Sequence, residues 1–408
     1  MARSFLVLVL AVSFFSCSKG VVRPAPILPT RPTPTISNFN PDNGAVGTVV
    51  TITGFNFSLD PAQNTVRFNG IATPVDSANH NTLIVKVPSG ALTGRITVTV
   101  NGYSNTSAKT FTVFQGIWNA GINFPDTPRG KTTAFSINGN AYVLGSYSSG
   151  EPQTNLWEYD TTTNQWTQRA DYPGLAKSSY AVFPIGRKAY VGLGYDSTTG
   201  YHNDFWEFDP ANNIWTRKTD FPGKPREAAI AFGFANTGII GLGGNITTDE
   251  FNYTDIWRYS PSSNQWTKMN DFPGTATWSA SSVAIDSIGY VFFGGSSPDD
   301  GTSNDLWTYH PSSDKWISTD KFPGENRVDA TAFVINKRIY AGFGIDRGNA
   351  FRDMWEYNPG NFTWIQRADC DGVPRYGAVG FSLGNKGFVG LGFAVAGQPL
   401  NDFWIFTL

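Results

Sequence analysis

The chain has 408 residues, of which 15 % are charged and 15 % aromatic, with 43 glycines and a formal net charge of −2. Few charges with many glycines and aromatics favour strands and tight turns over helices. The near-neutral charge gives no reason to expect binding to nucleic acid or bulk attraction to a membrane surface. The two cysteines predict no disulfide framework, and the three scattered histidines show no metal-ligand spacing. We therefore expect no metal and no cofactor.

The first 17 residues predict a targeting signal. Arg3 supplies a positive charge, and the apolar run over residues 5–15 is too short to span a bilayer. The run ends at Ser16-Cys17, which resembles a bacterial lipobox with Phe14 where Leu is usual. An ordinary signal peptide with an incidental cysteine is the alternative. The resemblance implies lipidation of Cys17, and hence a bacterial envelope protein held by lipid alone, in the outer membrane and facing either the periplasm or the surface.

A spacer and a small domain follow. Residues 18–33 are rich in proline, which fixes φ and predicts a semi-rigid extended linker. Residues 34–114 contain several short runs of period two, punctuated by Gly, Pro and Asn, which predicts an immunoglobulin-like β-sandwich. The pieces ISxFxPxxG at 36–44 and TITGxNF at 51–57 resemble the IPT/TIG family. In extracellular bacterial proteins this resemblance implies a spacer domain.

From residue 115 onward the chain repeats with a period near fifty. Each repeat contains four short strand patterns joined by tight turns, which predicts one blade of a β-propeller. The glycine doublets and late tryptophans resemble the kelch repeat. Two tryptophans mark the six repeats, the first at Trp157, Trp206, Trp257, Trp307, Trp355 and Trp404, the second at Trp118, Trp166, Trp215, Trp266, Trp316 and Trp364.

The two ends of the repeat region differ in phase. The chain stops at 404–408, a third strand without a fourth, whereas the region opens at 117–119, a fourth strand without the first three. We therefore expect the Trp118 strand to complete the last blade, which removes open sheet edges. The predicted fold class is all-β: an immunoglobulin-like β-sandwich followed, over residues 115–408, by a six-bladed kelch-type β-propeller. The tryptophans and the Phe-Pro motifs are interpreted as scaffold, because aromatics at the repeat period pack between blades.

One place in the repeat, here named the ring position, is cationic in five of six blades. It lies where the fourth strand of one blade passes to the inner strand of the next, so a propeller would place all six around the mouth of its central channel. Arginine forks there would suit a carboxylate ligand. The alternative is that they staple neighbouring blades. The ring position is held by Arg129, Lys177, Arg226, Thr277, Arg327 and Arg375.

The residues around the ring position carry the functional hypotheses. Trp278 and Tyr376 follow it in two blades and are candidate ligand contacts with the five cations, Trp278 by stacking on a sugar or aromatic. Aromatic residues in the loops between second and third strands are expected to form a binding rim on the same face. We therefore expect a monomeric, non-catalytic binding module whose partner is a glycan, anionic ones included, or an extracellular or periplasmic protein.

The alternative is an enzyme. Six-bladed kelch proteins resemble sialic acid mutarotases, which need a positioned acid or base and a carboxylate-binding arginine. Glu227 beside Arg226, and Asp329 near Arg327, are then the candidate catalytic residues. The sequence leaves open whether these two carboxyl groups approach each other.

Overall fold

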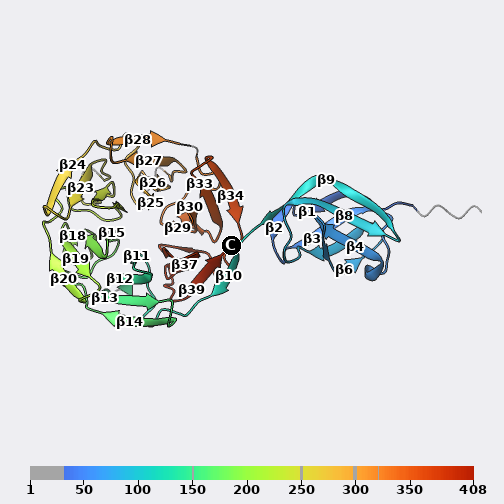
Figure 1. Ribbon diagram of the computed structural model, residues 1–408, viewed down its shortest axis with the longest axis horizontal. Coiled ribbons are helices and arrows are strands. Elements are labelled where there is room, and N and C mark those ends of the chain that lie inside the picture. Colours follow the sequence, from blue (N-terminus) through green and yellow to red (C-terminus); the bar gives the residue numbers. More distant parts are fainter. Residues whose placement is uncertain (1–31, 149–150, 249–250, 297–300, 320) are drawn as a thin grey trace, which may run out of the picture.

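The computed structural model describes residues 32–408 except 149–150, 249–250, 297–300 and 320. The predicted signal segment with Cys17, and all but the last two residues of the spacer, lie outside the described residues. The described chain forms a sandwich and a ring joined at residues 115 and 116 (Figure 1). Within this part the 3-10 helix η1 (Pro61–Gln63) is short, and no helix is long and apolar enough to cross a bilayer.

The N-terminal body is a β-sandwich, because its strands alternate buried and exposed side chains. In the third strand Val50 and Ile52 are fully buried while Val49 faces solvent. One sheet contains, in spatial order, β1 (Thr35–Asn40), β3 (Val49–Phe55), β7 (Thr82–Lys86) and β6 (Val75–Ala78). The other contains β2 (Asn43–Ala45), β9 (Tyr103–Phe114), β8 (Gly94–Val100), β4 (Asn64–Phe68) and β5 (Ile71–Thr73).

The ring consists of six four-stranded antiparallel sheets, the blades, numbered in chain order (Figure 1). Blade one contains β11 (Thr133–Ile137), β12 (Asn140–Ser148), β13 (Glu151–Asp160) and β14 (Gln165–Arg169), and blade two β15 (Ala181–Ile185), β16 (Lys188–Gly192), β19 (Phe205–Asp209) and β20 (Ile214–Arg217). Blade three contains β21 (Ile230–Gly233), β22 (Gly238–Gly241), β23 (Ile256–Ser260) and β24 (Gln265–Lys268), and blade four β25 (Ser281–Ile285), β26 (Ile288–Phe292), β27 (Leu306–His310) and β28 (Lys315–Ser318).

The last two blades complete the ring. Blade five contains β29 (Thr331–Ile335), β30 (Arg338–Gly342), β33 (Met354–Asn358) and β34 (Thr363–Arg367), and blade six β36 (Val379–Leu383), β37 (Lys386–Gly390), β39 (Phe403–Thr407) and β10 (Ile117–Ala120). Small two-stranded pairs lie outside the blades: β17 (Tyr195–Asp196) with β18 (Gly200–Tyr201), β31 (Ile345–Asp346) with β32 (Asn349–Ala350), and β35 (Arg375–Tyr376) with β38 (Phe393–Ala394).

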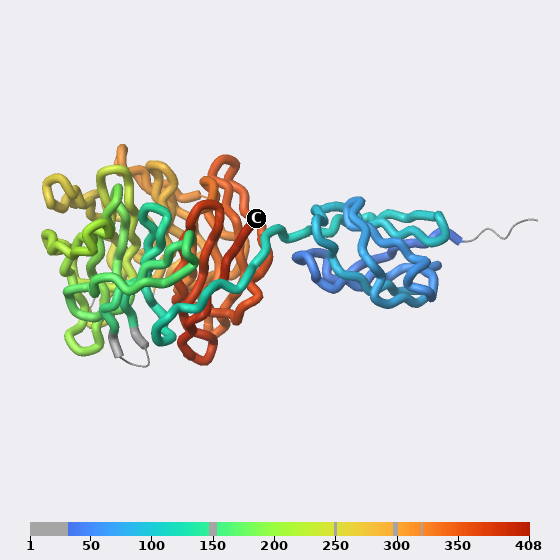
Figure 2. The backbone as a smooth tube through the Cα atoms, turned by 60° about the horizontal axis from the view of Figure 1, so that its bottom comes forward, coloured from blue at the N-terminus to red at the C-terminus, as the bar shows by residue number. Residues whose placement is uncertain are grey.

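The predicted closure of the ring is confirmed. β10 pairs antiparallel with β39, with Trp118 opposite Phe406 and Ile117 opposite Thr407. The strand after the sandwich therefore lies beside the last strand of the chain, and Figure 2 shows the sandwich standing off one side of the ring next to this junction. Pairing the two ends leaves blade six with the same four strands as the others.

The hydrophobic cores of the ring lie between neighbouring blades. Phe135 and Leu144 of blade one, for example, are buried against Val191 of blade two. At Gly238 of blade three an added Cβ would lie 2.0 Å from the ring of Phe183 in blade two, so this interface needs glycine. Each fully buried large side chain stabilises the fold by about 1.5–3 kcal/mol, and every blade contributes to two such interfaces.

The Phe-Pro aromatics pack as scaffold, as the sequence predicts. Phe221 meets Trp266 edge-on at a centroid distance of 5.3 Å, and Phe322 meets Trp364 at 5.1 Å. Blade six has Cys370 at this place, buried in the cluster that contains Trp118. Burial raises the pKa of the Cys370 thiol to about 12, which keeps it protonated and unreactive near neutral pH.

Candidate functional site

The five cationic side chains at the ring position are fully enclosed. Arg129, Lys177, Arg226, Arg327 and Arg375 each have a relative exposure of 0 %. The expectation of an open basic ring at the channel mouth is therefore corrected. A charged group can be buried only when it is paired, and each of these cations has a carboxylate beside it.

The partners are aspartates of the same blade. Arg226 donates from Nη1 and Nη2 to the two carboxylate oxygens of Asp255, at 2.6 and 2.9 Å. Burial alone would raise the pKa of Asp255, but hydrogen bonds and charge from Arg226 outweigh it and hold that pKa below its ordinary value. The remaining pairs are Arg129 with Asp126, Lys177 with Asp204, Arg327 with Asp353 and Arg375 with Asp402.

The first tryptophan of the repeat completes this arrangement. Trp257 Nε1 donates to Asp255 at 2.7 Å, and Trp355 Nε1 donates to Asp353 at 2.9 Å. The ring-position cation, the aspartate and the tryptophan thus form one buried hydrogen-bonded group. In five of the six blades the ring-position cation is therefore a structural staple, as the second interpretation expected, but its printed partners lie within its own blade and not in a neighbouring one.

The channel mouth is lined two residues further along the chain. There Lys131, Ser179, Ala228, Ser279, Asp329 and Gly377, one from each blade, have positive φ angles of 51 to 59°. Backbone hydrogen bonds connect these residues from one blade to the next around the axis. For example, the N–H of Asp329 donates to the carbonyl of Ser279 at 3.4 Å, and the N–H of Gly377 donates to the carbonyl of Asp329 at 2.9 Å. Together they surround a cavity of about 150 Å³.

Three charged groups act on one another at this mouth. The carboxylate of Asp329 is the largest cause of a raised pKa at Lys131, and Glu227 adds to it. The pKa of Glu227 is raised chiefly by burial, although Lys131 and a hydrogen bond with Ser179 oppose the shift. Glu227 and Asp329 also repel each other electrostatically. The two predicted carboxyl groups thus belong to one electrostatic cluster with Lys131.

The remaining predicted contacts lie around the same end of the ring. Trp278 is half-buried and meets Phe251 edge-on at 6.2 Å, and its Nε1 makes no hydrogen bond within the described residues. Tyr376 is half-buried and packs on Phe393 at 5.6 Å. Tyr376 also acts electrostatically on Lys131, which places it at the mouth.

The loop aromatics divide into two groups. Tyr253 lies 4.3 Å from the guanidinium carbon of Arg226, and Phe351 lies 4.2 Å from that of Arg327, so both cover the staples. Tyr201 instead acts electrostatically on Lys131, and its hydroxyl accepts a hydrogen bond from the backbone N–H of Ile246 at 3.2 Å. The side chain of Tyr147 lies outside the described residues.

Two family models match the chain. The IPT/TIG domain matches residues 34–113, and a kelch-repeat model described as the KLHDC2/KLHL20/DRC7 Kelch-repeats domain matches residues 228–408. The chain thus has a kelch-repeat domain over residues 228–408 and an IPT/TIG domain over residues 34–113. The six blades and the two-sheet sandwich described above agree with both matches.

Curated proteins match a small part of the chain, and a solved structure matches most of it. N-acetylneuraminate epimerase of Escherichia coli (strain K12) is 31 % identical over 94 residues, as is N-acetylneuraminate epimerase 2 of Escherichia coli O6:H1 (strain CFT073). The match spans 21 % of this chain and about a quarter (26 %) of those relatives. The solved structure titled "Structure of YjhT" has a TM-score of 0.61 at 15 % identity, over 71 % of this chain and 97 % of that chain. At that identity the likeness shows a shared fold.

Two features of the site are missed when the sequence is searched only for cations at the ring position. Four of the five aspartate partners stand two residues before the first tryptophan of the repeat, a spacing that is visible in the sequence: Asp204, Asp255, Asp353 and Asp402. Asp305 has the same spacing in blade four, where the ring position holds Thr277. Lys131 carries no such signal, since the five equivalent positions hold Ser, Ala, Ser, Asp and Gly. Only the closure of the ring brings it to Asp329 and Glu227.

Proposed function

We propose that the channel mouth binds a small carbohydrate, and that the propeller acts as a binding module displayed by the IPT/TIG domain. The observation that supports this most is a cavity of about 150 Å³ lined by Lys131 and Asp329, with Glu227 acting electrostatically on both. Pockets for drug-sized ligands measure roughly 300–1,000 Å³, so this one suits a single sugar unit.

The chemistry of the mouth favours hydroxyl groups over an anion. Lys131 supplies one cation against the two carboxyl groups of Asp329 and Glu227, so the mouth carries no excess of positive charge. Carboxylate oxygens accept hydrogen bonds from hydroxyls, and an ammonium group donates to them. Half-buried Trp278 and Tyr376 offer apolar surface beside these groups. A neutral or zwitterionic sugar therefore fits better than the anionic glycan that an open arginine ring would select.

The test is a titration of the described body, residues 32–408, with a panel of monosaccharides followed by NMR. We expect at least one sugar to bind saturably, and Lys131→Met to weaken it by about tenfold, because a charge-assisted hydrogen bond is lost. Lys337→Met is the matched control, since Lys337 forms an exposed ion pair with Asp286 at 2.8 Å. A panel in which no sugar distinguishes Lys131→Met from the control overturns the proposal.

A second candidate is an epimerase acting on a free sugar. The specific observation in its favour is Glu227, because burial raises the pKa of its carboxyl group, and a raised pKa favours a carboxyl group as a proton donor. The names of the N-acetylneuraminate epimerases add support. Exchange NMR of freshly dissolved sugars measures this directly: acceleration of anomer exchange that Glu227→Gln removes supports the enzyme, whereas saturable binding without acceleration supports the binding module.

We also propose that lipid on Cys17 attaches the protein to the bacterial envelope. The apolar run that ends at Ser16-Cys17 and the proline-rich spacer after it support this. In a bacterial host, labelled palmitate should enter the wild type and not Cys17→Ser, and the variant should leave the membrane fraction. Equal labelling or equal fractionation of the two proteins contradicts the anchor.

A further inference from the structure

Blade four contains a threonine where the other blades have a cation, yet its backbone is unchanged. Gly243 donates to the carbonyl of Thr277 at 3.0 Å, just as Gly194 donates to Arg226 at 2.9 Å and Gly294 to Arg327 at 3.1 Å. The chain therefore passes through the ring position in the same way in all three. Only the long side chain is missing from blade four.

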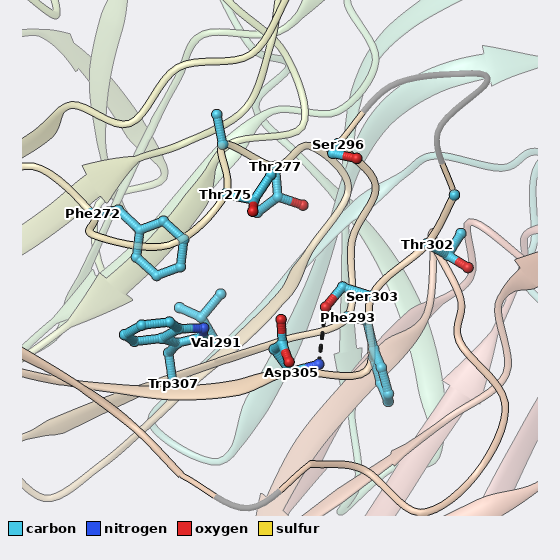
Figure 3. A pocket seen from close by; sticks show the side chains of 12 residues that line it. Phe272, Thr275, Thr277, Val291, Phe293, Ser296, Thr302, Ser303, Asp305 and Trp307 are labelled. Carbon is cyan, nitrogen blue, oxygen red and sulfur yellow. Dashed lines mark hydrogen bonds between the residues drawn. The ribbon is translucent and has the colours of Figure 1, made fainter.

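The missing side chain corresponds to a cavity. A space of about 140 Å³ is lined by Phe272, Thr275, Thr277, Phe293, Asp305 and Trp307, among others (Figure 3). Figure 3 shows Asp305 on one side of this space, and Phe272 and Trp307 on another. At about 30 Å³ per water, the cavity has room for roughly four or five water molecules. Because Asp305 is 47 % exposed at its side chain, the cavity is open to solvent at the carboxylate.

The blades with arginine at the ring position show which group occupies the equivalent space. In blade five, Arg327 Nε donates to the carbonyl two residues earlier at 3.0 Å, and Nη1 donates to the carbonyl sixteen residues later at 3.0 Å. Both Nη atoms donate to Asp353, and the guanidinium carbon lies 4.9 Å from the ring of Phe322, five residues earlier. Blade three repeats all four contacts around Arg226.

Blade four retains a counterpart of every one of these groups. Counting from Thr277, the carbonyls belong to Thr275 and Phe293, the carboxylate to Asp305 and the ring to Phe272. All four residues line the cavity. Phe272 also meets Trp307 edge-on at 5.1 Å, so the aromatic wall is in place.

Asp305 differs from the other aspartates in what it contacts. Its ion pair is with Lys321 at 2.9 Å, and the Lys321 side chain is 68 % exposed. Exposed pairs of this kind are worth about 0–1 kcal/mol, so Lys321 is easily displaced. Within the described residues, Asp305 accepts no hydrogen bond from Trp307, whereas Trp257 donates to Asp255. The carboxylate of blade four is thus held less firmly than that of blade three.

We propose that this cavity, the vacant socket of blade four, binds the guanidinium group of a ligand. A guanidinium is favoured over an ammonium because blade two, which has Lys177, presents Tyr172 at the aromatic position, whereas the arginines of blades one, three and five lie over Phe. Blade four presents Phe272. The planar fork of a guanidinium also matches one carboxylate together with two backbone carbonyls, which a single ammonium cannot reach at once.

The guanidinium can come from a free small molecule or from an arginine side chain of a peptide. The experiment therefore uses two probes, ethylguanidinium and a blocked tripeptide with a central arginine, with ethylammonium as the comparison. Binding to the protein is followed by NMR and by the melting temperature, which rises when a ligand binds only the folded state. Tighter binding of the tripeptide identifies a peptide source, and equal or weaker binding identifies a free guanidine.

Two variants of the socket and one control complete the design. Thr277→Arg should fill the socket, remove binding and melt above the wild type, because its own guanidinium takes the vacant contacts. Asp305→Asn should weaken binding by about tenfold or more, since the charge-assisted contacts are lost. Asp286→Asn, at an exposed ion pair 2.8 Å from Lys337, should bind as the wild type does.

The proposal is overturned by any of three results. These are no saturable binding of either guanidinium probe, equal binding by the wild type and a folded Asp305→Asn, or ethylammonium binding as tightly as ethylguanidinium. If Thr277→Arg does not fold, Asp305→Asn still carries the test. The socket is independent of the channel mouth, so Lys131→Met should leave guanidinium binding unchanged.

Discussion

Blade three and blade four are both four-stranded and share the backbone hydrogen bonds at the ring position, but they differ in the side chain that this position buries. In blade three, Arg226 is fully enclosed and bound to Asp255 at 2.6 and 2.9 Å. In blade four, Thr277 leaves a cavity, and the equivalent Asp305 faces an exposed lysine. The fold therefore does not require a staple in every blade. The propeller can lose it at one of six places, because blade interfaces supply most of the burial.

The largest effect is expected from removing one buried cation. Arg226→Ala leaves the carboxylate of Asp255 partly buried without its partner, which costs about 3–5 kcal/mol of unfolding free energy. Thr277→Ala loses only the hydrogen bond from the threonine hydroxyl to the carbonyl of Gly295 at 3.2 Å, at a cost of about 1 kcal/mol. Urea unfolding followed by tryptophan fluorescence measures both. Equal losses would show that the staple of blade three contributes nothing beyond packing.

Replacing the aspartate in each of the two blades tests the same difference at the partner of the cation. Asp255→Asn leaves the buried guanidinium of Arg226 uncompensated, and we expect it to cost about 3 kcal/mol. Asp305→Asn breaks only an exposed pair with Lys321, and we expect a change within about 1 kcal/mol. Melting curves of the two single variants beside the wild type provide the comparison. A large loss of stability in Asp305→Asn would contradict the weak ion pair that we infer for this carboxylate.

Acid should reduce the unfolding free energy that the buried ion pairs contribute. The pKa of Asp255 is lower in the folded state than its ordinary value of 3.8. Its ion pair therefore contributes full stability above that value, and the contribution disappears as the pH falls through the depressed folded pKa. The stability difference between wild type and Asp255→Asn should accordingly narrow below about pH 4. Denaturant unfolding at a series of pH values tests this, and a constant difference would exclude the linkage.

The smallest effect is expected at Lys321. Lys321→Met should change stability by no more than about 0.5 kcal/mol, because the side chain is 68 % exposed. The same variant should strengthen binding of ethylguanidinium, since the competing cation at Asp305 is gone. Unchanged or weaker binding would mean that Lys321 does not occupy the socket's carboxylate. Lys337→Met, at another exposed pair, serves as its control.

The repeat made the fold predictable in unusual detail. The spacing of the tryptophans near fifty residues and the phase of the two ends predict six blades closed by the Trp118 strand, and β10 pairs with β39 as expected. This works because a repeated scaffold repeats its packing, so each aromatic has five counterparts that confirm its role. The site was less predictable. A cation at five of the six ring positions indicates a shared role, and that role is stapling within the blade.

The sequence alone determined the class of fold, the number of blades and the identity of the position that breaks the pattern, because these depend on local periodicity. Only the tertiary structure decided that Arg226 at the ring position is enclosed, while Lys131, two residues beyond the ring position of its own blade, lines the channel mouth. It also decided that Thr277 leaves a cavity and that Asp305 lines it. The physical reason is that burial and charge pairing depend on which residues the closed ring brings together, and those residues lie far apart in the chain.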